Sequence, residues 1–377
     1  MAGIEDVAKL AGVSTATVSR ALSGKDHVSD RARQKVEAAA AELGYVASHS
    51  AYTLATGRNR NIGVVLPYID RWFFSAMLEA IENTLIEHGY DLTLYNLSGG
   101  EAQRAKIFND FLLRKRVDAV LTIAVRPSPA ELASLTAMKK PVLGVGGVIE
   151  GGRSLVMDDF KAGMLATQHL ISLGHTRIAH VSGKPGGDKE FNQESLRHQG
   201  YLHAMKEAGL DPYPAWQGEA DYTIQSAYHV TKQILGNPLD APSAILCNSD
   251  EMGFGTIIAV KDLGLRVPQD ISVIGIDNHD MSEFFGLTTL DQRVREQGSH
   301  ATKLLLNLLL DPGLESHVNV EEETDWPVEL IIRSSTARPA AGRSAGRDDG
   351  GDAALQHRQR VDQRRSGQGE FHFLLYS

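Results

Sequence analysis

Residues 15–20, TATVSR, carry side chains that can recognise base edges from a helix. Small side chains let a helix enter the major groove, where Ala16 can contact a thymine methyl group and Arg20 can bond a guanine edge at two points. Thr17 and Ser19 suit phosphate contacts, which position a protein without specifying sequence. An ordinary helical hairpin with solvated polar residues is the alternative. The candidates for DNA contact are therefore Thr15, Ala16, Thr17, Ser19 and Arg20.

Three helices are needed to position these side chains. Gly12 ends a first helix, because glycine reaches the positive φ of a tight turn at little cost. Ser14 can cap a second helix over 15–22, and Ser29 can cap a third that begins with Asp30. We therefore expect a helix-turn-helix within a unit of three helices. The expected core comprises Ile4, Val7, Ala8 and Leu10 of the first helix, Val18 and Leu22 of the second, and Ala32, Val36, Ala39 and Leu43 of the third.

The charge distribution separates this head from the rest of the chain. The 377 residues have a net charge of −9, but residues 1–60 hold 8 basic and 6 acidic side chains. Lys and Arg that neutralise phosphates release counterions, so a mildly basic head on an acidic body fits a head that meets a polyanion. The single cysteine, Cys247, excludes an internal disulfide. The start lacks the pattern of a signal peptide and no apolar run could span a bilayer, so we expect a cytoplasmic protein.

From Ile62 onward, short Val/Ile-rich runs alternate with longer amphipathic stretches. IGVVLP (62–67), DAVLTIA (118–124) and ISVIGI (271–276) are apolar on both faces, as buried parallel strands are. The alternation predicts βαβ units and doubly wound sheets. The number of units exceeds one ordinary sheet. We therefore expect an α/β fold with two similar lobes and a ligand between them at the carboxyl ends of the strands.

The composition also predicts the domain boundaries. A helix-turn-helix domain covers 1–46, a hinge and linker 47–61, and a two-lobed body 62–336. We place the first lobe at about 62–159 and 292–320 and the second at about 160–291 and 321–336. Residues 337–377 are rich in Gly, Arg, Gln and Asp without periodicity, which is typical of a disordered tail. The tail lacks the heptads of a tetramerising coiled coil, so we expect a homodimer.

The run from Ile4 to Tyr45, IEDVAKLAGVSTATVSRALSG…AELGY, resembles the DNA-binding head of the LacI/GalR family of bacterial transcriptional regulators. The resemblance continues through GRNRNIGVVLP, QHLISLGHTRIAHVSG, LGLRVPQDISVIGID and LTTLDQ, and covers about residues 3–336. It implies a repressor with a periplasmic-binding-protein-like effector domain. In that family the connector folds into a hinge helix on operator DNA, and a leucine from each subunit enters the minor groove. That leucine matches Leu54, and Ala51 matches a small residue at the contact between hinges.

The resemblance also implies an effector site between the lobes. Trp72 and Phe73 match a position where an aromatic ring can stack on a sugar or base, and a core role is the alternative. Asp250 can face the effector or cap the helix that follows it. Arg126 ends a strand, where it can face an acidic or phosphorylated ligand or lie on the surface. A cleft-side acid of the family matches Asp158 or its neighbour. The candidates for effector contact are Trp72, Phe73, Arg126, Asp158, Arg197, Tyr222, Asp250 and Asp277.

Three classes of function compete for this sequence. The first is a ligand-gated DNA-binding repressor, which must be a dimer to match two half-sites. The second is an exported-type solute-binding protein without DNA function, which the head and the missing signal peptide oppose. The third is a two-lobed enzyme, but no catalytic constellation and no nucleophile–base pair is evident. The histidine spacing fits no zinc pattern. We therefore expect a regulator without catalytic residues, metal or cofactor, whose partners are operator DNA and a small-molecule effector.

Overall fold

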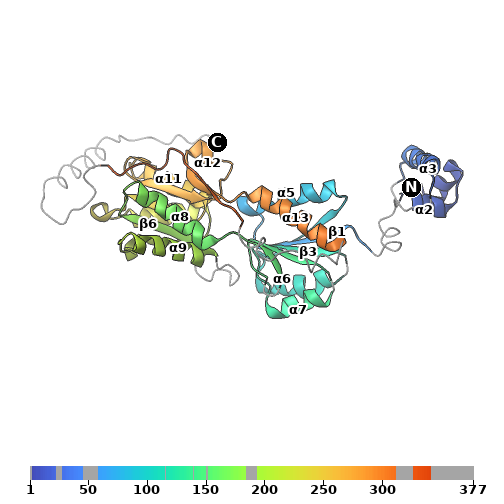
Figure 1. Cartoon of the computed structure of the whole chain (residues 1–377), viewed down its shortest axis with the longest axis horizontal. Helices are drawn as coiled ribbons and strands as arrows, with labels where there is room; N and C mark the ends of the chain where they lie inside the picture. The colour runs from blue at the N-terminus through green and yellow to red at the C-terminus, as the bar shows by residue number, and fades with distance from the viewer. Residues whose placement is uncertain are drawn as a thin grey trace, which may run out of the picture.

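The computed structural model describes residues 2–22, 28–45, 58–114, 116–138, 140–149, 152–183, 193–310 and 326–340. It contains a helical head and two α/β lobes (Figure 1). The sequence-predicted fold class, an α/β protein with a helix-turn-helix head and two doubly wound lobes, is therefore confirmed.

The head packs three helices, α1 (Ile4–Ala11), α2 (Thr15–Leu22) and α3 (Asp30–Leu43). Val7, Val18 and Val36, one from each helix, are fully buried against one another. Leu10 is 47% exposed, so its predicted place in the core is wrong. Successive helical residues rotate by about 100°, which carries position 10 away from the stripe formed by positions 4, 7, 8 and 11. Ala11 lies in the core instead.

The turn between α1 and α2 follows the predicted chemistry. Gly12 adopts a left-handed conformation with φ of 67°, and the Ser14 hydroxyl accepts a hydrogen bond from the Thr17 backbone N–H at 3.1 Å. Ser29 caps α3 by accepting from the Ala32 N–H at 3.3 Å. Arg33 of α3 donates to the Ala21 carbonyl at 2.8 Å, which ties α3 to the end of α2. The turn and these contacts fix the orientation of α2.

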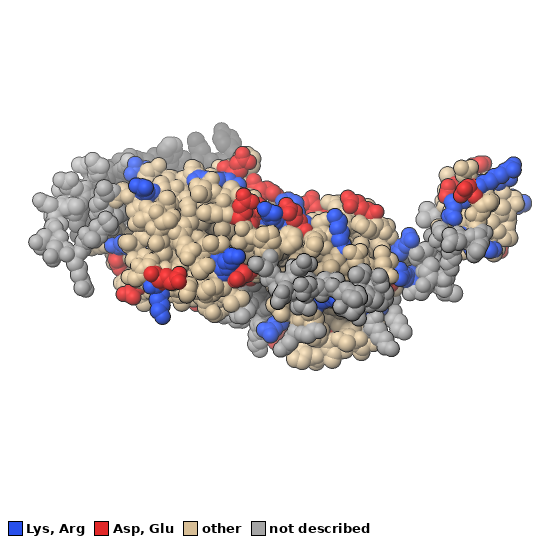
Figure 2. Space-filling view, viewed as in Figure 1, with Lys and Arg blue, Asp and Glu red and all other residues tan. Residues whose placement is uncertain are grey.

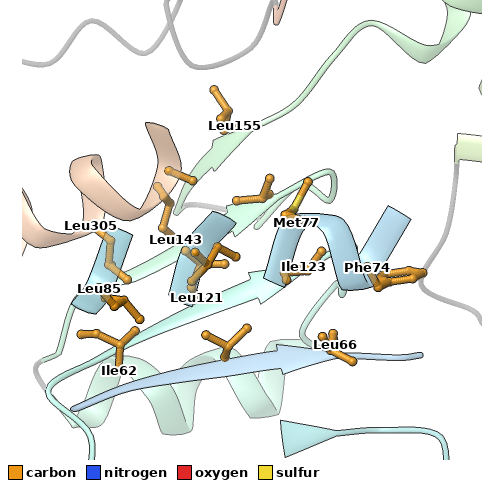
Figure 3. Close-up of a cluster of buried hydrophobic side chains, with 14 of the residues drawn as sticks. Ile62, Leu66, Phe74, Met77, Leu85, Leu121, Ile123, Leu143, Leu155 and Leu305 are labelled. Atoms are coloured by element: carbon orange, nitrogen blue, oxygen red, sulfur yellow. The ribbon is translucent and has the colours of Figure 1, made fainter. Parts of the chain in front are cut away.

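The first lobe is built on a five-stranded parallel sheet in the order β2-β1-β3-β4-β5. Its helices α5 and α13 cover one face, where Met77, Leu85, Leu121 and Leu305 belong to one apolar cluster (Figure 3). The other face meets α7 and a segment in which a π-helical turn, Ile107–Phe111, is followed by a 3₁₀ turn, Leu112–Arg114. The elements are β1 (Asn61–Leu66), α5 (Trp72–Glu87), β2 (Asp91–Asn96), α6 (Gly100–Lys106), β3 (Ala119–Ile123), α7 (Pro129–Ala137), β4 (Val142–Val145), β5 (Arg153–Leu155) and α13 (Val294–Leu310).

The second lobe is built on a six-stranded sheet in the order β11-β10-β9-β8-β6-β7, in which only β11 runs antiparallel to its neighbour. Helices α8 and α9 cover one face, and α10 and α11 cover the other. The elements are α8 (Asp159–Ser172), β6 (Ile178–Gly183), α9 (Gln193–Glu207), β7 (Gln217–Ala220), α10 (Ile224–Ile234), β8 (Ala244–Cys247), α11 (Asp250–Asp262), β9 (Ser272–Ile276), α12 (Ser282–Phe285), β10 (Thr288–Asp291) and β11 (Glu329–Ile331).

The order of strands predicts where a ligand would meet each sheet. In the first sheet the chain leaves β1 for β2 on one side and later reaches β3 on the other. In the second sheet β6 has β7 on one side and β8 on the other. Ligands of open α/β sheets bind outside the carboxyl ends of the strands at such reversals. Functional side chains are therefore expected at the carboxyl ends of β6, β8 and β9.

The chain crosses between the lobes at residues 156–158 and again at 291–293, and hydrogen bonds join these crossings to Trp326. The Trp326 backbone N–H donates to the Val156 carbonyl at 3.0 Å, and its indole Nε1 donates to the Gln292 carbonyl at 3.0 Å. Trp326 thereby holds the two crossings together.

The carboxyl-terminal segment extends the packed domain beyond the predicted boundary at Thr336. The Ala337 backbone N–H donates to the Ser272 hydroxyl at 3.1 Å, and its carbonyl lies 2.8 Å from Nε2 of the buried His175. Ala337 thus belongs to the lobe rather than to a tail. Residues 341–377 lie outside the described residues.

Candidate functional site

The head presents the predicted reading residues on α2. Thr15, Ala16 and Arg20 are exposed, while Thr17 and Ser19 are half-buried. Arg20 donates from Nε to the Ala16 carbonyl at 3.1 Å, which lays its side chain along the helix. The exposed face of α2 therefore offers a small apolar group, a hydroxyl and a guanidinium, which are the groups that read base edges in the major groove.

Ala51 and Leu54, the predicted minor-groove residues, lie outside the described residues. Their roles stay predictions.

Arg197 of α9 lies at the carboxyl ends of the second sheet's strands and is 5% exposed. Its Nε donates to Asp159 at 2.8 Å, and its Nη1 donates to the carbonyl of Asn248, the residue after β8. Burial by itself lowers the pKa of Arg197, but Asp159, Tyr222 and Asp277 raise it, and the net direction is upward. Arg197 is therefore a fixed cation within electrostatic reach of two carboxyl groups and a phenol.

Asp277 follows β9 and is 6% exposed. Its backbone has φ of 138°, a conformation that side chains rarely adopt, and its carboxylate accepts from Nε2 of Gln292 at 2.5 Å. Burial, and then the negative charge of Asp250, raise the pKa of Asp277 well above its usual value, while Arg197 opposes the shift. A strained backbone and a perturbed carboxyl group beside an arginine mark a functional site more often than a structural one.

Tyr222 follows β7 at the same edge of the sheet. Its backbone is left-handed, with φ of 55°, and its side chain is half-buried. A β-carbon added at Gly183, the last residue of β6, would lie 2.3 Å from the Tyr222 ring, so the glycine makes room for the ring. The structure thus brings Tyr222 and Asp277 within electrostatic reach of Arg197 at this edge of the sheet.

Asp250, at the start of α11, is fully buried and its carboxylate is occupied within its own lobe. One oxygen accepts from the Thr289 hydroxyl at 2.7 Å, and the other accepts from the His279 N–H at 2.9 Å and the Ser282 hydroxyl at 2.6 Å. Ser249 caps the helix instead. Burial raises the pKa of Asp250 to about 6 against these hydrogen bonds. Asp250 therefore holds the loop after β9 in place, a role that neither sequence interpretation anticipated.

Asp158 and Arg126 do not join the group around Arg197. Asp158 is exposed and caps α8, where it accepts from the Lys161 N–H at 2.9 Å. The acid that reaches Arg197 is its neighbour Asp159, because the first residue inside the helix faces α9 while the cap faces solvent. Arg126 is also exposed, and its carbonyl accepts from Arg104 at 3.1 Å.

Trp72 and Phe73, at the start of α5, differ in what they contact. Phe73 packs against the core of the first lobe, edge-to-face with Phe74 at 5.2 Å. Trp72 contacts the second lobe: its Nε1 donates to Asp280 at 3.0 Å, and its ring stacks on His279 at 4.7 Å. The Trp72 backbone also lowers the pKa of the Glu251 carboxyl group of α11, against the larger, raising effect of burial. Trp72 is therefore a junction between the lobes.

Arg295 of α13 strengthens this junction from the first lobe. It bonds both oxygens of Asp280, at 3.0 and 2.9 Å, and lies near Glu79 of α5 at 3.4 Å. Figure 2 shows acidic side chains, with basic ones beside them, along the boundary between the lobes. The sequence did not predict this junction, because its members lie far apart in the chain: Trp72, Glu251, Asp280 and Arg295.

A buried histidine network lies behind Arg197 and was also missed by the sequence interpretation. His180 of β6 is fully buried, with its Nε2 2.7 Å from Oδ1 of Asn248 and its Nδ1 2.9 Å from Nδ1 of His198. Its ring stacks on Tyr201 at 4.9 Å. Burial lowers the pKa of His180 to about 3. His180 is thus neutral in the folded protein and supports the residue whose carbonyl holds Arg197.

This histidine makes the protein sensitive to acid. Because the pKa of His180 is about 3 folded and 6.5 unfolded, its stabilising contribution is present above pH 6.5 and is lost as the pH falls toward 3. Between pH 7 and pH 4 we expect a loss of about 3 kcal/mol from this residue. His180→Gln should flatten the pH dependence of the unfolding free energy, measured by denaturant titration. His229→Gln, on the exposed face of α10, is the control. An unchanged slope in the His180 variant would contradict this assignment.

No cluster of histidine, cysteine or acidic side chains fit to hold a metal ion occurs among the described residues. None of the described helices is long and apolar enough to cross a membrane. A groove of about 610 Å³ lies between β2 and α6, lined by residues that include Leu94, Tyr95, Ile107 and Phe111. It contains none of the candidate residues for DNA or effector contact.

Comparisons with known proteins find relatives of both the helical head and the α/β body. Residues 3–48 match the model of bacterial regulatory proteins of the lacI family, and residues 167–336 match a periplasmic binding protein-like domain. The HTH-type transcriptional repressor PurR of Pectobacterium carotovorum is 35% identical over 343 residues, which cover 89% of this chain and 97% of that protein. The chain belongs to the LacI family. The ribose operon repressor of Escherichia coli K12 is also 35% identical, over 84% of this chain and 95% of that protein.

Solved structures of LacI-family proteins share the fold. A lac repressor dimer bound to operator and to the anti-inducer ONPF superposes with a TM-score of 0.76 at 28% identity, covering 89% of this chain and 99% of that one. A LacI-family regulator from Enterococcus faecium with bound ribose has a TM-score of 0.63 at 28% identity, covering 74% of this chain and 99% of that one. This chain is accordingly a LacI-type DNA-binding repressor under effector control, and not an enzyme.

Proposed function

We propose that this chain works as a homodimeric repressor in the cytoplasm, with its operator affinity set by a sugar or sugar derivative held between the lobes. The observation that carries the proposal is the group of Arg197, Tyr222 and Asp277 at one edge of the second sheet. Guanidinium donors and carboxylate acceptors complement vicinal hydroxyl groups, and an aromatic ring covers the apolar face of a sugar ring. The relatives named for the ribose operon and for bound ribose support this class of effector.

On the DNA side, we propose that α2 enters the major groove. Thr15, Ala16 and Arg20 would contact bases, and Thr17 and Ser19 would contact phosphates. Exposure of Thr15, Ala16 and Arg20 on one helix supports this assignment. We further propose that Leu54 enters the minor groove, with Ala51 at the contact between the two hinges, on the strength of the family resemblance.

Two copies are needed because two reading helices must match two half-sites. The lac repressor relative is a dimer on its operator. This chain also exposes apolar side chains on α11 and around α12, namely Ile258 at 40%, Met281 at 44% and Phe284 at 80% exposure. Large apolar side chains that are exposed on a single chain often form a subunit interface.

The junction at Trp72 would couple the effector site to the head. Asp277, in the effector site, is three residues before Asp280, which bonds Trp72 and Arg295 in the other lobe. A ligand that moves the loop after β9 must therefore change contacts between the lobes. Such a two-state rearrangement links the affinities of two distant sites.

The test is a binding screen followed by an operator assay. A thermal-shift assay on the full-length protein compares three classes of compound: uncharged sugars, with D-ribose as the first probe, sugar acids, and nucleobases. A ligand that binds the folded state raises the melting temperature of the protein. We expect at least one sugar to raise it and to change the affinity for a duplex selected from random DNA. A screen in which nucleobases alone bind would contradict the proposed effector class, while leaving the DNA-binding role intact.

A further inference from the structure

Asp159 and Arg197 form an ion pair that is buried in the second lobe. The distance from Nε of Arg197 to Oδ1 of Asp159 is 2.8 Å, and each side chain retains 6% of its exposure. By contrast, Arg104 and Glu131 retain 17% and 11% of their side-chain exposure in their ion pair, and the side chains of the Arg177–Asp240 and Arg266–Asp270 pairs each retain 23% or more. This pair therefore differs in kind from the surface pairs of the protein.

The fold brings the two residues together through an unusually close approach of α8 and α9. A β-carbon at Gly163 of α8 would lie 2.1 Å from the Arg197 carbonyl oxygen. A β-carbon at Gly200 of α9 would lie 2.0 Å from the Phe160 carbonyl oxygen. Two glycines that face the opposite helix let the first turn of α8 reach Arg197, so the pair is a built feature of this interface.

Asp159 neutralises Arg197, so the site lacks the net positive charge that would attract an anionic ligand. A buried charge is costly unless it is paired, and Asp159 supplies that partner at Nε while Asn248 occupies Nη1. Asp277 is a second carboxyl group within electrostatic reach of the guanidinium. Burial raises the pKa of Asp159 and Arg197 lowers it, with burial the larger effect. Arg197 can thus donate hydrogen bonds to a ligand without presenting an unbalanced charge.

We propose that Asp159 is a specificity-determining residue that makes the effector site select uncharged, hydroxyl-bearing ligands over carboxylates and phosphates. The proposal rests on the proposed function, in which Arg197 contacts the effector. Asp159 would act through Arg197, by cancelling its charge and fixing its orientation, and it need not contact the effector. The competing view is that the pair merely ties α8 to α9.

The substitution Asp159→Asn removes the negative charge of Asp159 while it keeps the orientation of Arg197. The asparagine oxygen can still accept from Nε of Arg197, so the orientation is kept while the negative charge is lost. We expect the full-length variant to bind inorganic phosphate at least tenfold more tightly than the wild type, by isothermal titration calorimetry, with the gain declining as NaCl is added. Adding Arg197→Gln to this variant should abolish the gain.

Asp240→Asn is the matched control, because Asp240 also pairs with an arginine of the second lobe, Arg177, at 3.0 Å, but on the surface. It should bind phosphate no better than the wild type. Asp159→Ser, which leaves room for a water molecule, replaces Asp159→Asn if that variant does not fold.

Two results would overturn the proposal. One is equal phosphate affinity in the wild type and the Asp159 variants, and the other is a gain that persists when Arg197 is also replaced. A purely structural pair predicts lower stability with unchanged ligand selectivity. Failure of the proposed function looks different: no uncharged sugar would bind the wild type, whatever the phosphate affinity of the variants.

Discussion

Arg197→Ala is expected to abolish the response of operator binding to the effector and to lower the free energy of unfolding by about 3 kcal/mol. The variant leaves Asp159 without its partner in a buried position and leaves the carbonyl of Asn248 without its Nη1 donor. Breaking a buried ion pair from one side costs far more than the pair is worth in net terms, because an uncompensated charge remains. Denaturant titration measures the stability, and fluorescence anisotropy of a labelled duplex measures the response.

The double variant Arg197→Ala/Asp159→Ala separates the two effects. Removing both charges should recover part of the lost stability, because no lone buried carboxylate remains, but the effector response should stay absent. A double variant that regains the response would show that Arg197 serves the fold alone. Equal stability of the single variant and the wild type would contradict the burial argument.

Arg20→Ala is expected to reduce the preference for operator over random DNA by about 1–3 kcal/mol, the usual value of a two-point arginine–guanine contact. Arg20 is exposed on α2, and its present bond to the Ala16 carbonyl can be exchanged for a base edge when DNA arrives. Affinities for the selected duplex and for a scrambled duplex are compared at several salt concentrations.

Arg31→Ala provides the control for Arg20, since it removes the same charge from an exposed position on α3, outside the reading helix. It should weaken binding to both duplexes equally. If Arg20→Ala also weakens both equally, Arg20 contacts phosphates and does not read bases.

Local sequence patterns correctly predicted many of the helices and strands that carry the candidate DNA-contact and effector-contact residues. The caps and turns of the head depend on neighbouring residues, so Gly12, Ser14 and Ser29 could be assigned directly from their positions. Strand ends were equally legible, because a short apolar run that stops at a polar residue marks the carboxyl edge of a sheet. Asp277 was proposed as a site residue in this way, and Arg197 through the family resemblance.

Sequence reasoning left roles open or incomplete where they depend on contacts between distant segments. Asp158 and Asp159 are adjacent and identical in type, and only the packing of α8 against α9 decides which one reaches Arg197. Asp250 has the position of a ligand-facing residue, but three donors from the loop after β9 and from β10 occupy its oxygens. The aromatic character of Trp72 suggested stacking on a ligand, while its partners His279 and Asp280 lie in the other lobe.

In the proposed mechanism, occupation of the second lobe's strand ends controls the affinity of the head for DNA. The most direct measurement is anisotropy of the selected duplex, titrated with wild type and with Arg197→Ala, each with and without the sugar found by thermal shift. We expect a shift of at least fivefold in the wild type, which is a coupling of about 1 kcal/mol, and no shift in the variant. An unchanged wild-type affinity at saturating sugar, or an equal shift in the variant, would contradict it.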